Sequence, residues 1–155
     1  MQIEASIVIG ADGVESKVAR WAGIDGSLPP EDTMTCAQFL VLDKSIDQDF
    51  CHFFFGNRLA PGGYAWIFPK GGQMANVGVG IQGSQSSPGK PLELLKSFLG
   101  GAMPNASILQ VVTGGIPTTR PMKTAVSDGV MLVGDAAHQS DPLTGGGIIN
   151  AVRAG

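Results

Sequence analysis

The stretch that decides the fold is Val130-Met-Leu-Val-Gly-Asp-Ala-Ala-His138, together with the segment from Gln139 to Gly155 that follows it. The apolar run at its start predicts a short buried strand, and Gly134-Asp135 predicts the turn that ends this strand. A glycine-rich loop then leads into residues 148–154, whose spacing predicts the first turns of a helix. A carboxylate accepts hydrogen bonds from hydroxyl groups, and glycines let the backbone approach a bound group closely. A helix start adds free N–H donors, so the stretch predicts a pocket for the polar parts of a cofactor.

Two other stretches of the sequence also have residue patterns that predict a specific local structure. Val8-Ile-Gly-Ala-Asp-Gly-Val-Glu-Ser-Lys-Val18 predicts a strand, an Asp-Gly turn and a helix over 14–22, with Asp12 or Ser16 as its N-cap. Gly63-Tyr-Ala-Trp-Ile-Phe-Pro69 predicts a strand whose three aromatic residues share one face. By itself this alternation leaves two readings open: the aromatic face packs the sheet, or it lines a channel for an apolar chain.

Taken together, the three stretches resemble the glutathione-reductase-like FAD enzymes, in the branch that holds the aromatic hydroxylases and the geranylgeranyl reductases. The pattern from Gly134 to Gly147 resembles the second flavin-binding motif, and residues 8–18 resemble the strand–Asp-Gly–helix motif. Residues 63–69 resemble the Tyr-x-Trp-x-Phe-Pro element of geranylgeranyl reductases, including the archaeal enzymes that saturate isoprenoid ether lipids. The resemblance spans nearly the whole chain. It implies an α/β fold, α+β within this chain, in which pieces of an FAD-binding domain flank an antiparallel substrate-binding sheet.

The resemblance also implies roles for individual residues. In such enzymes the acid at Asp135 bonds a ribityl hydroxyl, the Asp12-Gly13 turn packs against the pyrophosphate region, and Pro142 lies near the ring. The glycine-rich helix start points at the N1–C2=O edge of the flavin and favours its reduced form. The expected cofactor-binding residues are Asp12, Gly13, Gly134, Asp135, Pro142, Gly145, Gly146 and Gly147. The expected substrate-binding residues, as the wall of a polyprenyl cavity, are Tyr64, Trp66 and Phe68.

No residue is assigned as the catalytic acid. We expect His138 to have a structural role, with a contact to the flavin or proton donation as the alternatives. His52 is expected to be an ordinary strand residue. The two cysteines, Cys36 and Cys51, match neither a disulfide framework nor a metal motif, so we expect buried free thiols and no metal site.

The order of patterns predicts two domains. Residues 1–27 and 120–155 are expected to meet as a partial FAD-binding domain, and residues 28–119 to form the inserted sheet domain. Besides the strand at 130–133, the predicted strands cover residues 3–9, 35–42, 50–55, 64–68, 74–81 and 107–116, and the four between 35 and 81 are expected to form an antiparallel meander. A second helix is predicted over 91–98.

Composition limits the function classes. A net charge of −3 without a basic stripe argues against nucleic-acid binding. Charged residues make up 15% of the chain, against a usual share of about 25%, which predicts much apolar surface facing more protein, an apolar substrate or a membrane. No apolar run approaches the roughly 18 residues of a membrane-spanning helix. We therefore expect a cytoplasmic protein, with peripheral membrane contact compatible with a lipid substrate.

The resulting hypothesis is a fragment of an FAD-dependent oxidoreductase that reduces C=C bonds of geranylgeranyl chains in membrane lipid biosynthesis. A Gly-x-Gly-x-x-Gly fingerprint is expected upstream, so the FAD site is expected to be incomplete and the fragment inactive alone. The expected partners are an isoprenoid lipid and an electron donor such as a reduced ferredoxin or a nicotinamide cofactor. The alternatives are an FAD-dependent aromatic monooxygenase and a non-catalytic module that binds lipid or a protein partner.

Overall fold

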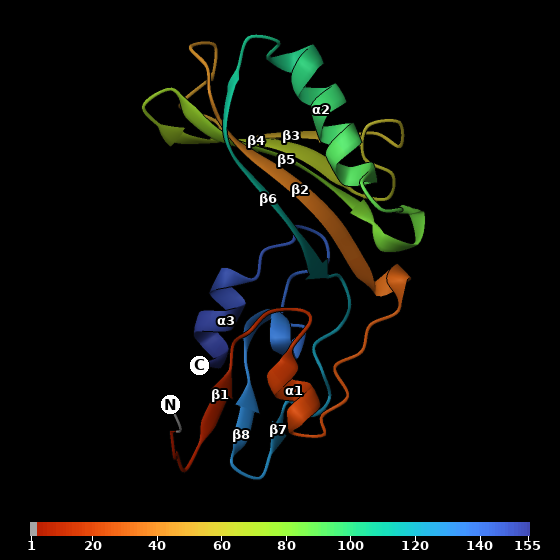
Figure 1. The fold of residues 1–155 in the computed structure, drawn as a ribbon, viewed down its shortest axis with the longest axis vertical. Coiled ribbons are helices and arrows are strands. Elements are labelled where there is room, and N and C mark those ends of the chain that lie inside the picture. The colour runs from red at the N-terminus through yellow and green to blue at the C-terminus, as the bar shows by residue number, and fades with distance from the viewer. Residues whose placement is uncertain (1–2) are drawn as a thin grey trace. The chain divides into compact units, whose positions relative to one another are not determined.

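The computed structural model describes residues 3–155, which divide into two compact units (Figure 1). The first unit combines the chain up to Thr33 with Ile116–Gly155, and the second is Met34–Gly115. A discontinuous unit flanking an inserted one is the organisation that the sequence predicts. The assignment of these units as cofactor-binding and substrate-binding domains stays a prediction.

The first unit is built on a small sheet with strand order β1-β8-β7. Its strands are β1 (Val8–Gly10), β7 (Val126–Ser127) and β8 (Val130–Leu132), and its helices are α1 (Lys17–Trp21), α3 (Ile148–Ala154) and the short 3₁₀ helices η1 (Pro30–Asp32) and η3 (Gly134–Ala137). β1 runs parallel to β8, with Val8 opposite Val130, although the two are far apart in sequence. This pairing places the turn after β1 beside the turn after β8.

Two predicted elements of the first unit are shorter than expected. The strand predicted from Ile3 is restricted to β1, and the helix predicted from Val14 begins only at Lys17. The helix starts late because Asp12 and Ser16 both act as caps, so the first free N–H groups bond to side chains. Both residues that the sequence offered as alternative caps are therefore used.

The second unit is a five-stranded sheet with one helix. Its elements are β2 (Thr33–Leu42), β3 (His52–Phe55), β4 (Tyr64–Gly71), β5 (Met74–Gln82), η2 (Gly83–Gln85), α2 (Lys90–Ala102) and β6 (Ser107–Pro117), of which the terminal residues Thr33, Ile116 and Pro117 belong to the first unit. The strand order is β3-β4-β5-β2-β6, so the predicted meander is wrong at its first strand: β2 pairs with β5 and not with β3. Length accounts for this, because all nine residues of β5 find partners on the ten-residue β2, while β3 has only four residues.

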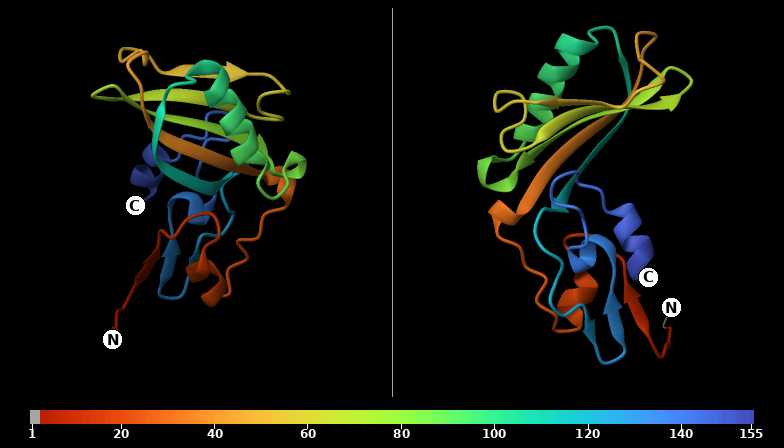
Figure 2. Two further views of the ribbon diagram at one scale, coloured as in Figure 1. Left: turned by 45° about the horizontal axis from the view of Figure 1, so that its top comes forward. Right: turned by 180° about the vertical axis from the view of Figure 1, so that it is seen from behind.

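The core of the second unit lies between α2 and one face of this sheet (Figures 1 and 2). Leu95 is fully buried and Leu99 nearly so. They pack with alternate sheet residues, which are Ala37, Phe39, Val41, Ala65, Ala75, Val77, Val79 and Ile81. The opposite face, which carries Tyr64, Trp66 and Phe68, has no helix of this unit packed on it.

The β4–β5 hairpin shows why one strand boundary was mispredicted. Pro69 was expected to end β4, yet the strand continues to Gly71. The pairing with β3 ends at Ile67, so beyond it one side of β4 is a free edge, where a missing N–H costs little. The turn itself is Gly72-Gln73, both with positive φ, as a tight two-residue hairpin requires.

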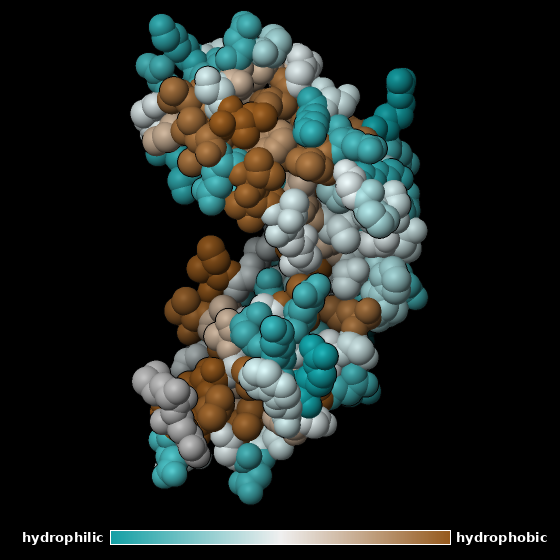
Figure 3. All heavy atoms as spheres, in the orientation of Figure 1, coloured by the Kyte–Doolittle hydropathy of each residue, from teal (hydrophilic) through white to brown (hydrophobic). Residues whose placement is uncertain are grey.

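Exposed apolar side chains occur on several elements of both units, as the low charged content predicts, and two groups of them are on α3 and β6. Figure 3 shows them over α3 in the first unit and along β6 in the second. The residues are Ile148, Ile149 and Val152 on α3, and Ile108, Leu109, Val111 and Val112 on β6. Within residues 3–155 no helix is long and apolar enough to cross a membrane.

Candidate functional site

A pocket of about 380 Å³ in the first unit gathers most of the predicted cofactor-binding residues. It lies where the turns after β1 and β8 meet the start of α3. It is lined by Ala11, Gly13, Ile116, Val133, Gly134, Asp135, Ser140, Gly145, Gly147, Ile148 and Ala151. The segments around residues 12 and 135 therefore share one cavity, as the sequence predicts. Pro142 and Gly146 are on the adjoining loop and do not line it.

Only one of the two oxygens of the Asp135 carboxylate accepts a hydrogen bond within residues 3–155. Its Oδ1 accepts a hydrogen bond from Ser140 Oγ at 2.7 Å, and Ser140 is almost completely buried. Within the described chain no partner contacts Oδ2, so this oxygen remains available as an acceptor. A carboxylate with one anchored and one free oxygen, at the wall of a pocket, suits recognition of a ligand hydroxyl.

Gly147 is a position where a side chain would disturb this arrangement. A Cβ there would lie 2.9 Å from Ser140 Oγ and 3.0 Å from Asp135 Oδ1. Both separations are tighter than ordinary contacts, so an alanine would push on the hydroxyl and the carboxylate at once. The glycine thus lets the beginning of α3 approach the acid.

Two groups that sequence reasoning missed hold the loop before α3. Asp141 accepts hydrogen bonds from the Thr144 N–H at 2.7 Å and from the Leu143 N–H at 3.1 Å. The bonds from Thr144, backbone and side chain, lower the pKa of Asp141, and the Leu143 N–H adds to this. Ser140, which anchors Asp135, was also not predicted. The Asp-Pro-x-Thr sequence was a usable signal for Asp141, because an aspartate followed by such residues typically bonds the backbone of its own turn.

Asp12 caps α1, which is one of the two roles that the sequence left open. Its carboxylate accepts hydrogen bonds from Ser16 Oγ at 2.6 Å and from the Lys17 N–H at 2.8 Å. The Ser16 hydroxyl, followed by the backbone N–H groups of Val18 and Lys17, lowers the pKa of Asp12. The carboxylate is thus engaged in capping α1, and it is the neighbouring backbone at Ala11 and Gly13 that lines the pocket. A cofactor role for Asp12 stays a prediction.

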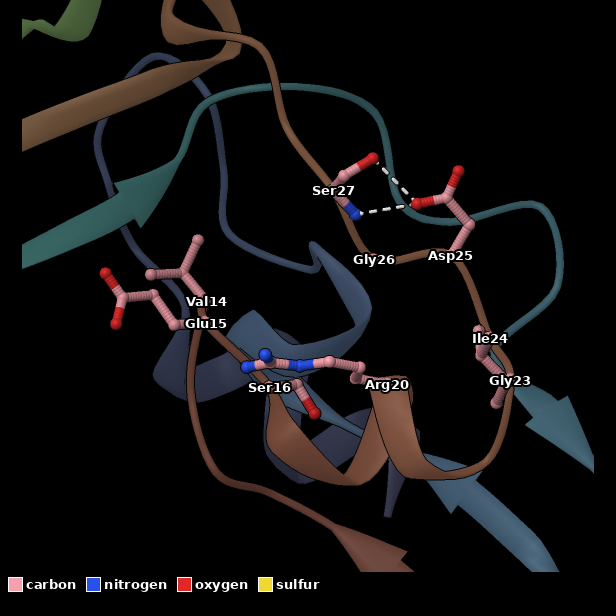
Figure 4. Close-up of a pocket in the computed structure, with 9 residues that line it drawn as sticks. All are labelled: Val14, Glu15, Ser16, Arg20, Gly23, Ile24, Asp25, Gly26 and Ser27. Carbon is pink, nitrogen blue, oxygen red and sulfur yellow. Dashed lines mark hydrogen bonds between the residues drawn. The ribbon is translucent and has the colours of Figure 1, made fainter.

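A second hollow, of about 530 Å³, lies beside α1 and was not predicted (Figure 4). Figure 4 shows Arg20 on the helix and the loop of residues 23–27 facing it. In that loop Asp25 accepts hydrogen bonds from the hydroxyl and the backbone N–H of Ser27, which lower its pKa. This acid is therefore paired within its own turn.

His138 is buried, with 5% of its surface exposed, and its Nε2 lies 3.3 Å from the carbonyl oxygen of Gly26. Its backbone is in the left-handed region, with φ of 56°. This contact ties η3 to the loop after α1 and agrees with the expected structural role. His52 is on β3, and its Nε2 lies 3.3 Å from Asp47 Oδ2 in a half-exposed pair.

The predicted substrate-binding residues form one continuous aromatic row on β4. Neighbouring ring centroids are 5.7 Å apart between Tyr64 and Trp66, and 6.0 Å apart between Trp66 and Phe68. Phe53 on β3 extends the row, with its ring 5.1 Å from Phe68 and 5.6 Å from Tyr64. Phe55 also contacts Tyr64 and is 75% exposed. The sheet face opposite α2 is therefore an apolar aromatic surface.

The cysteines differ from each other. Both are free, and burial raises the pKa of Cys36 to about 12, whereas Cys51 is exposed and does not match the expected buried thiol. Among residues 3–155 no cluster of His, Cys, Asp and Glu has the arrangement of a metal site.

Comparison with known proteins gives this geometry its context. Residues 32–116 match the geranylgeranyl reductase catalytic domain. The chain belongs to the geranylgeranyl reductase family. Over its full length it is 61% identical to the digeranylgeranylglycerophospholipid reductase of Methanothrix thermoacetophila and covers 40% of that protein. The chain thus spans about two fifths of the length of this curated relative of the geranylgeranyl reductase family.

Solved structures agree at the level of the fold. A geranylgeranyl bacteriochlorophyll reductase-like protein from Thermoplasma acidophilum superposes with a TM-score of 0.91 at 37% identity, over 97% of this chain and 39% of that one. A flavin-dependent brominase superposes with a TM-score of 0.69 over 99% of this chain and 42% of that one. At 17% identity, the brominase shows that the fold is shared and nothing more.

Proposed function

We propose that the first unit forms part of an FAD site in which Asp135 binds a ribityl hydroxyl of the flavin. Three features of the chain fit such a group. The Oδ2 of Asp135 is free to accept, the acid lines a pocket together with four of the predicted glycines, and Gly147 keeps the acid clear of side chains. Membership of the geranylgeranyl reductase family supports the same cofactor.

We propose that the Asp12-Gly13 turn contributes to the FAD site through its backbone and not through the Asp12 carboxylate. Its acid is taken up by the cap of α1, while Gly13 lines the pocket with a φ of 87° and has open space at its Cβ position. The absence of a side chain there leaves room for the pyrophosphate region of the cofactor.

For the second unit, we propose that Tyr64, Trp66 and Phe68 lie against an isoprenoid chain. The five rings of this face offer a continuous apolar surface, and Phe53 and Phe55 are substantially exposed on it. Burying such rings against a hydrocarbon chain is favourable by about 25 cal/mol per Å² removed from water. A digeranylgeranylglycerophospholipid, the substrate class in the names of the relatives, carries chains of this kind.

The reaction that follows is saturation of a C=C bond. A bound reduced flavin would supply the hydride for this chemistry, and an acid or water would supply the proton that the second carbon takes up. The share of this chain is to bind the ribityl side of the cofactor through Asp135, to hold the hydrocarbon against the aromatic face, and to exclude water there. A reduced ferredoxin or a nicotinamide cofactor as electron donor, and peripheral contact with a membrane, remain parts of the same proposal.

A flavin titration with matched acids tests the cofactor site. In a protein of the relatives' full length that carries this chain, Asp135→Asn should weaken FAD binding by about tenfold to a hundredfold, because a charged acceptor is replaced by a neutral one. Asp128→Asn, an exposed acid in the β7–β8 turn, should leave the affinity unchanged. Equal affinities for both variants and the native protein would rule out the assigned role of Asp135.

A product assay tests the reaction. With FAD, a chemical reductant and a geranylgeranyl ether lipid, mass spectrometry should detect saturated product. Absence of saturated product, combined with oxygen-dependent hydroxylation of an aromatic compound, would favour the monooxygenase alternative.

A further inference from the structure

Trp66 lies in a row of residues that crosses four strands in register. Phe53 on β3 is opposite Trp66 on β4, which is opposite Gly78 on β5, which in turn is opposite Gln38 on β2. Opposed residues in register point to the same face of a sheet, here the face away from α2. Between the two large side chains of the row and Gln38, Gly78 leaves a gap.

The indole ring fills this gap. A Cβ on Gly78 would lie only 2.2 Å from Cζ2 and 2.3 Å from Cε2 of Trp66. The ring therefore lies over the backbone of β5, where any residue with a side chain would collide with it. This explains why Trp66 is only 8% exposed although no helix of its unit covers it, while Phe53 in the same row is 49% exposed.

Gln38 holds the far edge of the ring. The indole Nε1–H donates a hydrogen bond to Gln38 Oε1 at 3.2 Å, across the width of β5. The indole nitrogen is only a donor, so rotation of the ring away from the sheet would break this hydrogen bond. The adjacent Gly80 is filled differently, since a Cβ there would lie 2.5 Å from the Met34 sulfur. The two glycines thus create one depression that receives Trp66 and another that receives Met34.

We infer that Gln38 and Gly78 are positioning residues that hold the Trp66 indole flat on the sheet and thereby set the depth of the surface on which the hydrocarbon chain lies. The inference rests on the proposed role of the aromatic face in binding an isoprenoid chain. With the ring flat, the surface between Tyr64 and Phe68 is shallow and open. With the ring raised, the indole would occupy the path of a chain that crosses this row. Gln38 therefore acts on the binding of the hydrocarbon chain indirectly, by fixing the position of the Trp66 ring.

The two tryptophans make this testable by fluorescence. Trp21 is 78% exposed on α1 in the other unit, so Trp21→Phe leaves Trp66 as the single reporter with little effect on packing. In this background we would compare the native Gln38 with Gln38→Leu, which removes the acceptor, and with Gln38→Glu, which keeps one. Gly78→Ala is the independent variant, because its methyl group would force the ring to move by more than about 1 Å to reach ordinary contact. The measurements are the anisotropy of Trp66 emission without ligand and the Kd for geranylgeraniol from Trp66 emission.

The expected result is lower anisotropy and about threefold to tenfold weaker binding of geranylgeraniol in Gln38→Leu, the range of one lost neutral hydrogen bond, with near-native values in Gln38→Glu. Gly78→Ala should weaken binding at least as much. If Gly78→Ala fails to fold, the two Gln38 variants still decide the matter. Native anisotropy and a native Kd in Gln38→Leu would overturn the inference while leaving the substrate role of the face intact. If geranylgeraniol does not change Trp66 emission even with native Gln38, the proposed substrate role of the aromatic face fails, and the ligand-free anisotropy still shows whether Gln38 holds the ring.

Discussion

Ser140 offers a sharp test of the cofactor pocket, because the same hydrogen bond occurs elsewhere in an exposed setting. Ser140 Oγ donates to Asp135 Oδ1 at 2.7 Å, and the serine is 3% exposed. Ser27 Oγ donates to Asp25 Oδ1, also at 2.7 Å, but both residues are exposed. Both pairs are in the first unit, so Ser140→Ala and Ser27→Ala remove equivalent bonds from one cooperative structure and differ in burial.

The magnitudes follow from burial. A hydrogen bond to a charged group contributes about 1.5–3 kcal/mol when its loss leaves the acceptor without a partner. Water replaces the hydroxyl at Asp25, so Ser27→Ala should cost less than about 0.5 kcal/mol. Ser140→Ala should therefore reduce the stability of the first unit by about 1.5–3 kcal/mol, which corresponds to roughly a tenfold to hundredfold larger opening constant.

Hydrogen exchange measures this directly. The Val133 N–H, which donates to the Gly10 carbonyl and joins β8 to β1, should exchange about tenfold to a hundredfold faster in Ser140→Ala. Amides of β5 in the second unit provide the internal control and should not change. Equal exchange in Ser140→Ala and Ser27→Ala would refute the claim that the buried serine anchors the acid.

Three further outcomes are expected. Leu95→Ala should lower the free energy of unfolding of the second unit by about 2–5 kcal/mol, because Leu95 is fully buried between α2 and the sheet; urea denaturation followed by Trp66 fluorescence checks this, and an unchanged midpoint contradicts it. Iodoacetamide in mildly alkaline buffer should add one group per native chain, at Cys51, and two in urea, since burial raises the pKa of Cys36 to about 12; modification of Cys36 in the native protein would count against this. Asp12→Asn should cost up to about 1 kcal/mol at neutral pH as a weakened cap. The pKa of Asp12 is lowered in the folded protein, so its contribution is present above the ordinary value near 4 and is lost as the pH falls through the lowered pKa; the stability difference measured by urea denaturation should therefore vanish in acid.

Much of the candidate site was predictable from short-range patterns. The glycine turn at Gly134, the acid after it and the helix at 148–154 are local features, and each occurs where the spacing predicts it. Ser140 could not be recognised, because its importance comes from a single contact with a carboxylate five residues away and from its burial. The role of Asp12 could not be decided from the sequence either, because its sequence context suits both capping and cofactor binding. Only the observed hydrogen bonds to Ser16 and Lys17 show that the cap is formed.

The sequence by itself determined the approximate positions of most strands and helices, and that three aromatic residues share one face of β4, because periodicity is a local property. The tertiary structure decided which strands become neighbours, since the pairing of β1 with β8 and of β2 with β5 depends on matching lengths and faces across long separations. It also decided that Trp66 is buried while its row neighbour Phe53 is exposed. The burial of Trp66 depends on Gly78 of β5, which lies under the ring, and on Gln38 of β2, which accepts a hydrogen bond from its N–H. Both residues are on other strands, so no pattern within β4 predicts this difference.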